Sequence, residues 1–159
     1  MSCNNIIKRG LLVLIIGLLC CPLAQAIDIN LLKKSMESTL KSLDNHNDHN
    51  FCRIIKNMNQ DVVSCEIYQS YKDGHAEIAT RVDLENTDNN EQPIKQPDTE
   101  KTINGYKVKI WYDKIYAGPR HKEVLMTTYQ VKLKQGLRLH LTCWENHECY
   151  AEQFLEKLN

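Results

Sequence analysis

The sequence predicts an α+β protein: an antiparallel sheet of about six strands, flanked by an N-terminal and a C-terminal helix and held by two disulfides. Beyond residue 26, apolar residues recur at spacings of three and four near both ends of the chain, and they alternate with polar residues in between. Short turn signals such as Asp73-Gly74 and Gly118-Pro119 separate the alternating stretches. No crossover helix is indicated between strands, so we expect antiparallel pairing.

The first 26 residues have the features of a secretory signal peptide. Lys8 and Arg9 precede an apolar run over 11–19, and Ala24 and Ala26 supply the small residues that a signal peptidase requires. The apolar run is shorter than the ~20 residues of a spanning helix, which argues against a retained anchor. We expect cleavage after Ala26, export to a bacterial periplasm or the extracellular space, and a single mature domain over 27–159 without membrane attachment.

A lipoprotein is the alternative fate of this leader, with Cys20 or Cys21 as the lipidated residue. The residue before such a cysteine should be small, and here it is Leu19 or Cys20, so we favour simple cleavage. The whole chain has 20 basic and 20 acidic residues, and loss of Lys8 and Arg9 leaves 18 basic against 20 acidic, a net charge of −2. Because no basic block remains, we do not expect a nucleic-acid partner.

Four cysteines follow the expected cleavage site, and an even number in an exported chain indicates two disulfides. A zinc site is the weaker interpretation, because the last two cysteines are separated by five residues and the compartment is oxidising. The four are Cys52, Cys65, Cys143 and Cys149.

Strand pairing selects one of the three possible disulfide connectivities. Residues 51–57 and 61–69 look like two strands around the turn NMNQ. If they pair as a hairpin centred on that turn, opposite residues have numbers that sum to 117, and Cys52 lies directly opposite Cys65. The remaining two cysteines then pair with each other, linking the end of the last strand to the start of the last helix.

Two amphipathic runs predict the helices. After Asp28, a stripe of apolar residues extends over roughly 15 residues to Leu43, and 149–158 carries a second stripe. We expect both stripes to pack on the sheet; a partner-binding face is the minor alternative for the first. The remaining strands are predicted over residues 76–84, 106–112, 122–134 and 137–143.

Residues 85–102 are predicted to form a mobile polar loop. They include one aliphatic residue, two prolines and many charges, which cannot bury enough apolar area to offset the entropy of ordering. A loop of this length inside a small domain is uncommon, so binding by the loop itself is the alternative.

One histidine-rich stretch, LDNHNDHNFC over 43–52, raises the question of a metal site. Two imidazoles with nearby carboxylates can bind zinc, copper or nickel. The intervening asparagines favour a turn, and the stretch lacks the glycine and closing glutamate of a calcium loop. We favour a solvated loop and keep a metal-binding function as the alternative, with His46, His49, Asp44 and Asp48 as ligands.

No enzyme motif is present, so an enzyme is the less favoured class and no cofactor is expected. The alternative is a small secreted hydrolase whose site is assembled by folding from dispersed His, Asp and Glu residues. A deep polar pocket that holds two or more histidines would favour it. The histidines concerned are His75, His121, His140 and His147.

The favoured function is binding through one face of the sheet. Trp111 alternates with lysines on its strand and Trp144 with Arg138 and His140 on its own, so both tryptophans would share a face with cations if these strands are neighbours. Aromatic and basic residues are typical of recognition surfaces, although helices covering that face would make both tryptophans core. The candidate surface is Trp111, Trp144, Lys107, Lys109, Arg138 and His140. We expect a protein partner, as for an inhibitor, an immunity-type protein or a secreted factor that acts on a host cell.

Mass spectrometry of the protein purified from an exporting host, without a tag, tests the leader and the cysteines. We expect the mass of residues 27–159 less four hydrogens, because two disulfides remove one hydrogen per cysteine. A retained leader, a lipid adduct on Cys20 or Cys21, or a stoichiometric metal would contradict this expectation.

Overall fold

The computed structural model describes residues 28–44, 47–57, 60–86, 95–117 and 122–158. The predicted signal peptide and its cleavage site lie outside these residues. None of the helices in these ranges is long and apolar enough to cross a membrane.

The described residues form one seven-stranded antiparallel sheet with two helices, so the predicted fold class is confirmed, with seven strands in place of about six. The spatial order is β1-β2-β3-β7-β6-β5-β4, which places the last strand of the chain in the middle of the sheet. In chain order the elements are α2 (Ile29–Lys41), β1 (Phe51–Asn57), β2 (Gln60–Ser70), β3 (Ala76–Asn86), β4 (Thr99–Ile103), β5 (Tyr106–Ala117), β6 (Lys122–Lys132), a 3-10 turn (Lys134–Gly136), β7 (Leu137–Trp144) and α3 (Ala151–Lys157).

The additional strand, β4, lies in the segment that was predicted to be loop. It pairs with β5 through a turn at Asn104 and Gly105, whose φ values of 47° and 78° suit asparagine and glycine. At the other end of the predicted loop, β3 extends to Asn86. The sequence concealed β4 because it is an edge strand of mostly polar residues, and of its side chains only Ile103 is buried.

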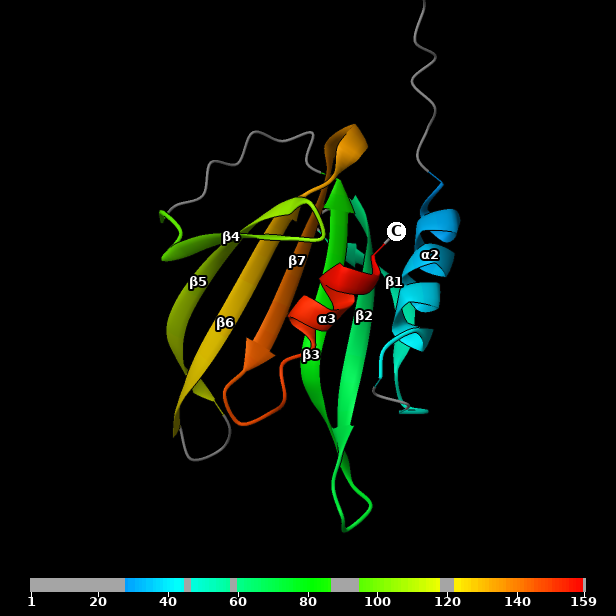
Figure 1. Cartoon of the computed structure of the whole chain (residues 1–159). Coiled ribbons are helices and arrows are strands. Elements are labelled where there is room, and N and C mark those ends of the chain that lie inside the picture. Colours follow the sequence, from blue (N-terminus) through cyan, green and yellow to red (C-terminus); the bar gives the residue numbers. More distant parts are fainter. Residues whose placement is uncertain (1–27, 45–46, 58–59, 87–94, 118–121, 159) are drawn as a thin grey trace, which may run out of the picture.

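Both helices lie on the same face of the sheet (Figure 1). Helix α2 packs on β1 and β2, and α3 packs on β4 and β7. Asp28 caps α2, accepting a hydrogen bond from the amide of Asn30 at 2.9 Å. The predicted apolar stripes point into the core, where Met36, Leu40 and Phe154 are almost fully buried. The core therefore lies between one face of the sheet and the two helices.

The two disulfides are Cys52–Cys65 and Cys143–Cys149. The register of β1 and β2 follows the predicted sum of 117, and it sets the first two cysteines directly opposite each other. Because both bridges lie beside the core, they restrain the first hairpin and the connection into α3.

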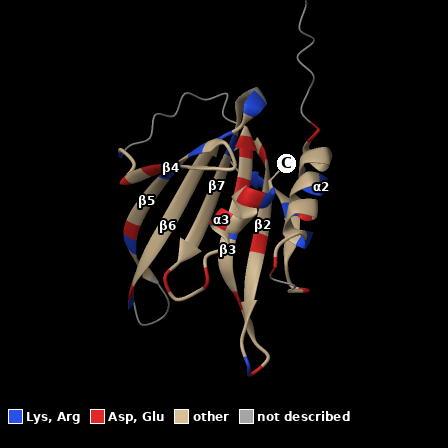
Figure 2. Cartoon of the chain, viewed as in Figure 1, with Lys and Arg blue, Asp and Glu red and all other residues tan. Residues whose placement is uncertain are grey.

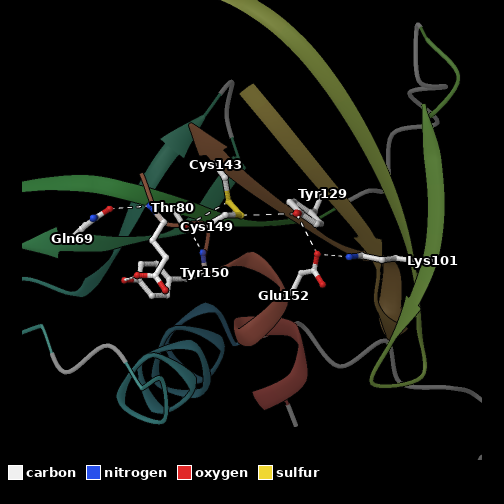
Figure 3. Close-up of a disulfide and its surroundings, with 9 residues drawn as sticks. Gln69, Thr80, Lys101, Tyr129, Cys143, Cys149, Tyr150 and Glu152 are labelled. Carbon is white, nitrogen blue, oxygen red and sulfur yellow. Dashed lines mark hydrogen bonds and ion pairs between the residues drawn. A yellow bond between two sulfur atoms is a disulfide. The ribbon is translucent and has the colours of Figure 1, made fainter. Parts of the chain in front are cut away.

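Helix α3 begins at Ala151, two residues later than the sequence predicted. The preceding residues hold the chain to the sheet instead (Figure 3): Cys149 is bonded to Cys143, and the amide of Tyr150 donates to the hydroxyl of Thr80 at 2.9 Å. These two attachments fix where the helix starts, because they use backbone and side-chain groups that a longer helix would have to release.

The first turn of α3 is also attached through Glu152. Its carboxylate accepts a hydrogen bond from the hydroxyl of Tyr129 on β6 and forms an ion pair with Lys101 on β4 (Figure 3). Burial, followed by the neighbouring Glu152 carboxylate, raises the pKa of Tyr129 to about 12. Helix α3 thus connects the middle of the sheet to its β4 edge.

Replacing each disulfide by two alanines measures how much the two bridges stabilise the fold. Their cysteines are 13 and 6 residues apart, so we expect the Cys52→Ala/Cys65→Ala variant to lose more stability than the Cys143→Ala/Cys149→Ala variant. Loop-closure entropy puts the losses at ~3 and ~2 kcal/mol. Urea denaturation measures both, and unchanged unfolding midpoints would contradict the expectation.

Candidate functional site

The face of the sheet opposite the helices carries all six residues of the predicted binding surface. Val108 and Ile110 of β5 point into the core, so Lys107, Lys109 and Trp111 point the other way. On β7 the same alternation buries Leu137, Leu139, Leu141 and Cys143 and directs Arg138, His140 and Trp144 to the opposite face. We call this side of the sheet the helix-free face, since neither α2 nor α3 packs on it.

The strands that carry the two tryptophans are not neighbours, because β6 lies between them. The register places Trp111 opposite Thr128, whereas Trp144 lies opposite Met126, the next residue of β6 on the same face. The prediction that the two tryptophans lie together required their strands to be neighbours, and they are not. They share a face, one strand apart.

Trp111 is buried, with 8% of its surface exposed, although no helix covers it. Its indole Nε1 donates to the backbone oxygen of Lys95 at 3.1 Å, and the ammonium of Lys95 lies 3.3 Å from Asp113, which neighbours Trp111 on the same face. Residues 95–98, which we call the strap, thus fold over this part of β5. The strap buries Trp111 and leaves Trp144, which is half-buried, as the accessible tryptophan.

The strap is itself held at Asp98. Its carboxylate accepts a hydrogen bond from the amide of Tyr112 at 2.8 Å, and this bond, together with Lys95, lowers the pKa of Asp98. Hydrogen bonds to Asp113 and Asp98 raise the pKa of Lys95 in turn. Hydrogen bonds at Lys95 and Asp98 thus attach the strap to the helix-free face.

A buried carboxylate on β2 was not anticipated from the sequence. Glu66 is 4% exposed, and it accepts hydrogen bonds from Arg53 at 2.9 Å, Arg81 at 3.1 Å and the hydroxyl of Tyr68 at 3.0 Å. Desolvation and the Glu66 carboxylate raise the pKa of Tyr68. A lone glutamate within the apolar run of β2 was the available signal, and cross-strand arginines on β1 and β3 supply its partners.

Lysines gather where β5 begins and β6 ends. Lys107, Lys109, Lys132 and Lys134 line a pocket of about 540 Å³ together with Tyr106 and Leu133. None of the four lysines forms an ion pair with another described residue. We call these four lysines the basic corner; its β6 end is visible as the blue turn that leads into β7 (Figure 2).

Arg138 and His140 of β7 do have an acidic partner. Glu85 of β3 accepts a hydrogen bond from Nε2 of His140 at 2.9 Å and lies 3.7 Å from Arg138. The carboxylates of Glu66, Asp83 and Glu85 lie on the β2–β3 side of this face. Charge on the helix-free face is therefore divided, nearly balanced over β1–β3 and positive over β5 and β6.

The candidate metal ligands do not converge among the described residues. Asp44 accepts a hydrogen bond from Gln153 at 2.6 Å, whereas Asp48 and His49 line a polar pocket of about 460 Å³ with Glu148 and Tyr150. His46 lies outside the described residues. Within the described ranges, no three His, Cys, Asp or Glu side chains are grouped so that they could hold a metal ion.

Folding brings two of the dispersed histidines to one place. Nε2 of His147 lies 3.6 Å from the carboxylate of Glu77, Nε2 of His75 lies 4.0 Å from it, and the Tyr71 hydroxyl bonds Nδ1 of His147 at 2.9 Å. Desolvation and Glu77 raise the pKa of Tyr71. The side chains of His75 and Glu77 are 51% and 52% exposed, so this is a surface cluster that ties the β2–β3 turn to the chain after β7. His121 lies outside the described residues.

Glu66→Gln tests whether the buried carboxylate organises the β1–β3 side of the helix-free face. We expect a loss of about 2 kcal/mol in the free energy of unfolding, because the substitution leaves two arginines without their counter-charge. Glu123→Gln, which removes the exposed Lys114–Glu123 pair, is the control and should change stability by less than about 0.5 kcal/mol. Equal effects in chemical denaturation would show that Glu66 behaves like a surface residue.

Comparison of the chain with models of protein families, with curated proteins and with solved structures gives no match to any of them.

Proposed function

We propose that this chain is an exported binding protein that recognises a protein partner through the helix-free face. The observation that carries this proposal is that one whole face of the sheet, from β1 to β5, is left without a helix in the described part of the chain while it presents arginines, lysines and a half-buried tryptophan.

The composition of the helix-free face supports recognition. Interfaces are enriched in tryptophan and arginine, and their energetically important residues lie in partly preformed, well-packed surroundings. Trp144 is flanked on β7 by Thr142 and lies opposite Met126 of β6, and elsewhere on this face the Glu66 cluster and the strap hold side chains in place. A rigid surface of this kind loses little conformational entropy on binding.

Binding accounts for the chemistry better than catalysis does. In the histidine cluster the side chains of His75 and Glu77 are 51% and 52% exposed and that of His147 is 15% exposed, so water reaches the carboxylate that lies near both imidazoles. Disulfides next to the core are compatible with an exported chain, because they persist in oxidising compartments. An inhibitor, an immunity-type protein and a host-directed secreted factor all fit this chemistry, because each acts by protein recognition.

Site-specific photocrosslinking tests the proposed surface. We expect a photoreactive residue in place of Gln130, at the centre of the helix-free face between Lys109 and His140, to crosslink a discrete partner in native extracts. Trp144→Ala in the same protein should abolish that adduct, because it removes the accessible aromatic side chain. Trp111→Ala is less suitable, since its buried indole supports the fold.

Leu31 provides the matched control position, because it is 65% exposed on α2, on the opposite side of the molecule. A photoreactive residue there should give no adduct with the same partner. Crosslinking from Leu31 and not from Gln130, or an adduct that survives Trp144→Ala, would overturn the assignment of the binding face.

A further inference from the structure

The basic corner places like charges directly opposite one another. Lys132 of β6 lies opposite Arg138 of β7, and Lys107 of β5 and Lys132 are the residues that follow the paired Val108 and Val131 at the same end of their strands. Three cations therefore form a continuous row across three strands. Like charges in directly opposite positions destabilise a sheet, so this row costs the fold stability that opposite or neutral residues would not.

Little within the described chain offsets that cost. Arg138 is partnered by Glu85, but Lys107 and Lys132 form no ion pair with a described residue. Glu100 of β4 lies opposite Lys109 in the register, and no ion pair joins them. Repulsion between like charges that no contact within the fold offsets is expected at a surface that binds a partner.

The same lysines surround a pocket that has an apolar interior. Its volume is about 540 Å³, and the aliphatic stems of the lysines supply its apolar surface on the helix-free face, whereas Tyr106 and Leu133 pack against the core. A volume of this size accommodates a few side chains, with the ammonium groups at the rim. The pocket therefore suits a ligand that combines negative charges with an apolar group.

We propose that the basic corner binds an acidic segment of the protein partner, with aspartate or glutamate side chains at the four lysines and one apolar side chain against the aliphatic stems of those lysines. This inference rests on the proposed function and names the chemistry of the partner. Lysine ammonium groups provide point charges without the planar fork of arginine, so they select negative charge more than the shape of the anion.

The distribution of charge favours a short acidic segment over an extended polyanion such as nucleic acid. A polyanion that ran on from the basic corner across the sheet would meet the carboxylates of Asp83 and Glu85 on β3. The mature chain expected from the sequence also has a net charge of −2, counting 18 basic and 20 acidic residues, which disfavours non-specific binding to nucleic acid. The positive region is thus confined to one end of β5 and β6.

Calorimetry with the oxidised mature protein and an acetylated, amidated Gly-Glu-Glu-Phe-Glu-Glu-Gly peptide tests this proposal at low ionic strength. Lys107→Glu should weaken peptide binding about tenfold or more and, in the same protein, raise the thermal unfolding midpoint, because it creates an opposite-charge pair with Lys132. Lys34→Glu, an exposed position on α2, makes the same change in net charge and should alter affinity less than about twofold.

Four results would overturn the proposal: unchanged affinity in Lys107→Glu, a lowered unfolding midpoint in that variant, equal binding of the peptide with Gln in place of Glu, or displacement of the peptide by inorganic tripolyphosphate with the tighter affinity. The last result would assign the corner to a phosphate anion. Because calorimetry needs no natural partner, its outcome is independent of the crosslinking experiment. If the Lys107→Glu variant forms the crosslinked adduct equally well, the proposed binding face is still supported, and only the proposal of an acidic segment is rejected.

Discussion

The pairing of β3 with β7 is the interaction on which the rest of the structure depends. All other strand pairs join strands that are consecutive in the chain, whereas this one brings residues 80–86 against 137–143. It joins a three-stranded meander to a four-stranded one, and only the joined sheet is wide enough to accept both helices on one face. The helix-free face depends on the same pairing, because Glu85 on β3 partners Arg138 and His140 on β7. Closing the long loop between β3 and β7 costs conformational entropy, and the core and surface contacts that the pairing makes possible offset this cost.

The elements with strong periodicity could be predicted from the sequence, and the contacts between distant segments could not. Alternation located β5 and β7 because each buries one side of its strand, whereas β2 is buried on both sides from Val62 to Ile67, and hairpin arithmetic gave the Cys52–Cys65 register. Strand β4 was missed because an edge strand needs only one buried residue, Ile103. The place of β7 in the middle of the sheet follows from tertiary packing, and no local signal encodes it.

The candidate surface, too, could be predicted from the sequence only in part. Alternation alone put six residues on one face, and the structure has all six there. Alternation could not predict that the strap buries Trp111, because the strap precedes β4 and its position depends on the β4–β5 pairing. Nor could it give the row of Lys107, Lys132 and Arg138, because that requires the order of three strands. The sequence thus predicted which residues share a face, but not which of them lie beside one another across the strands.

Both disulfides join cysteines that follow one another in the chain, at sequence separations of 13 and 6, and neither crosses the β3–β7 pairing. During the export proposed above, each bridge can close as soon as its short segment emerges, before the long-range contact forms. An oxidase that pairs successive cysteines would already give the native connectivity, so maturation has no inherent need for a disulfide isomerase. The slow step of folding then falls on the meeting of the three-stranded and four-stranded meanders, the first of which already holds a disulfide-bonded hairpin.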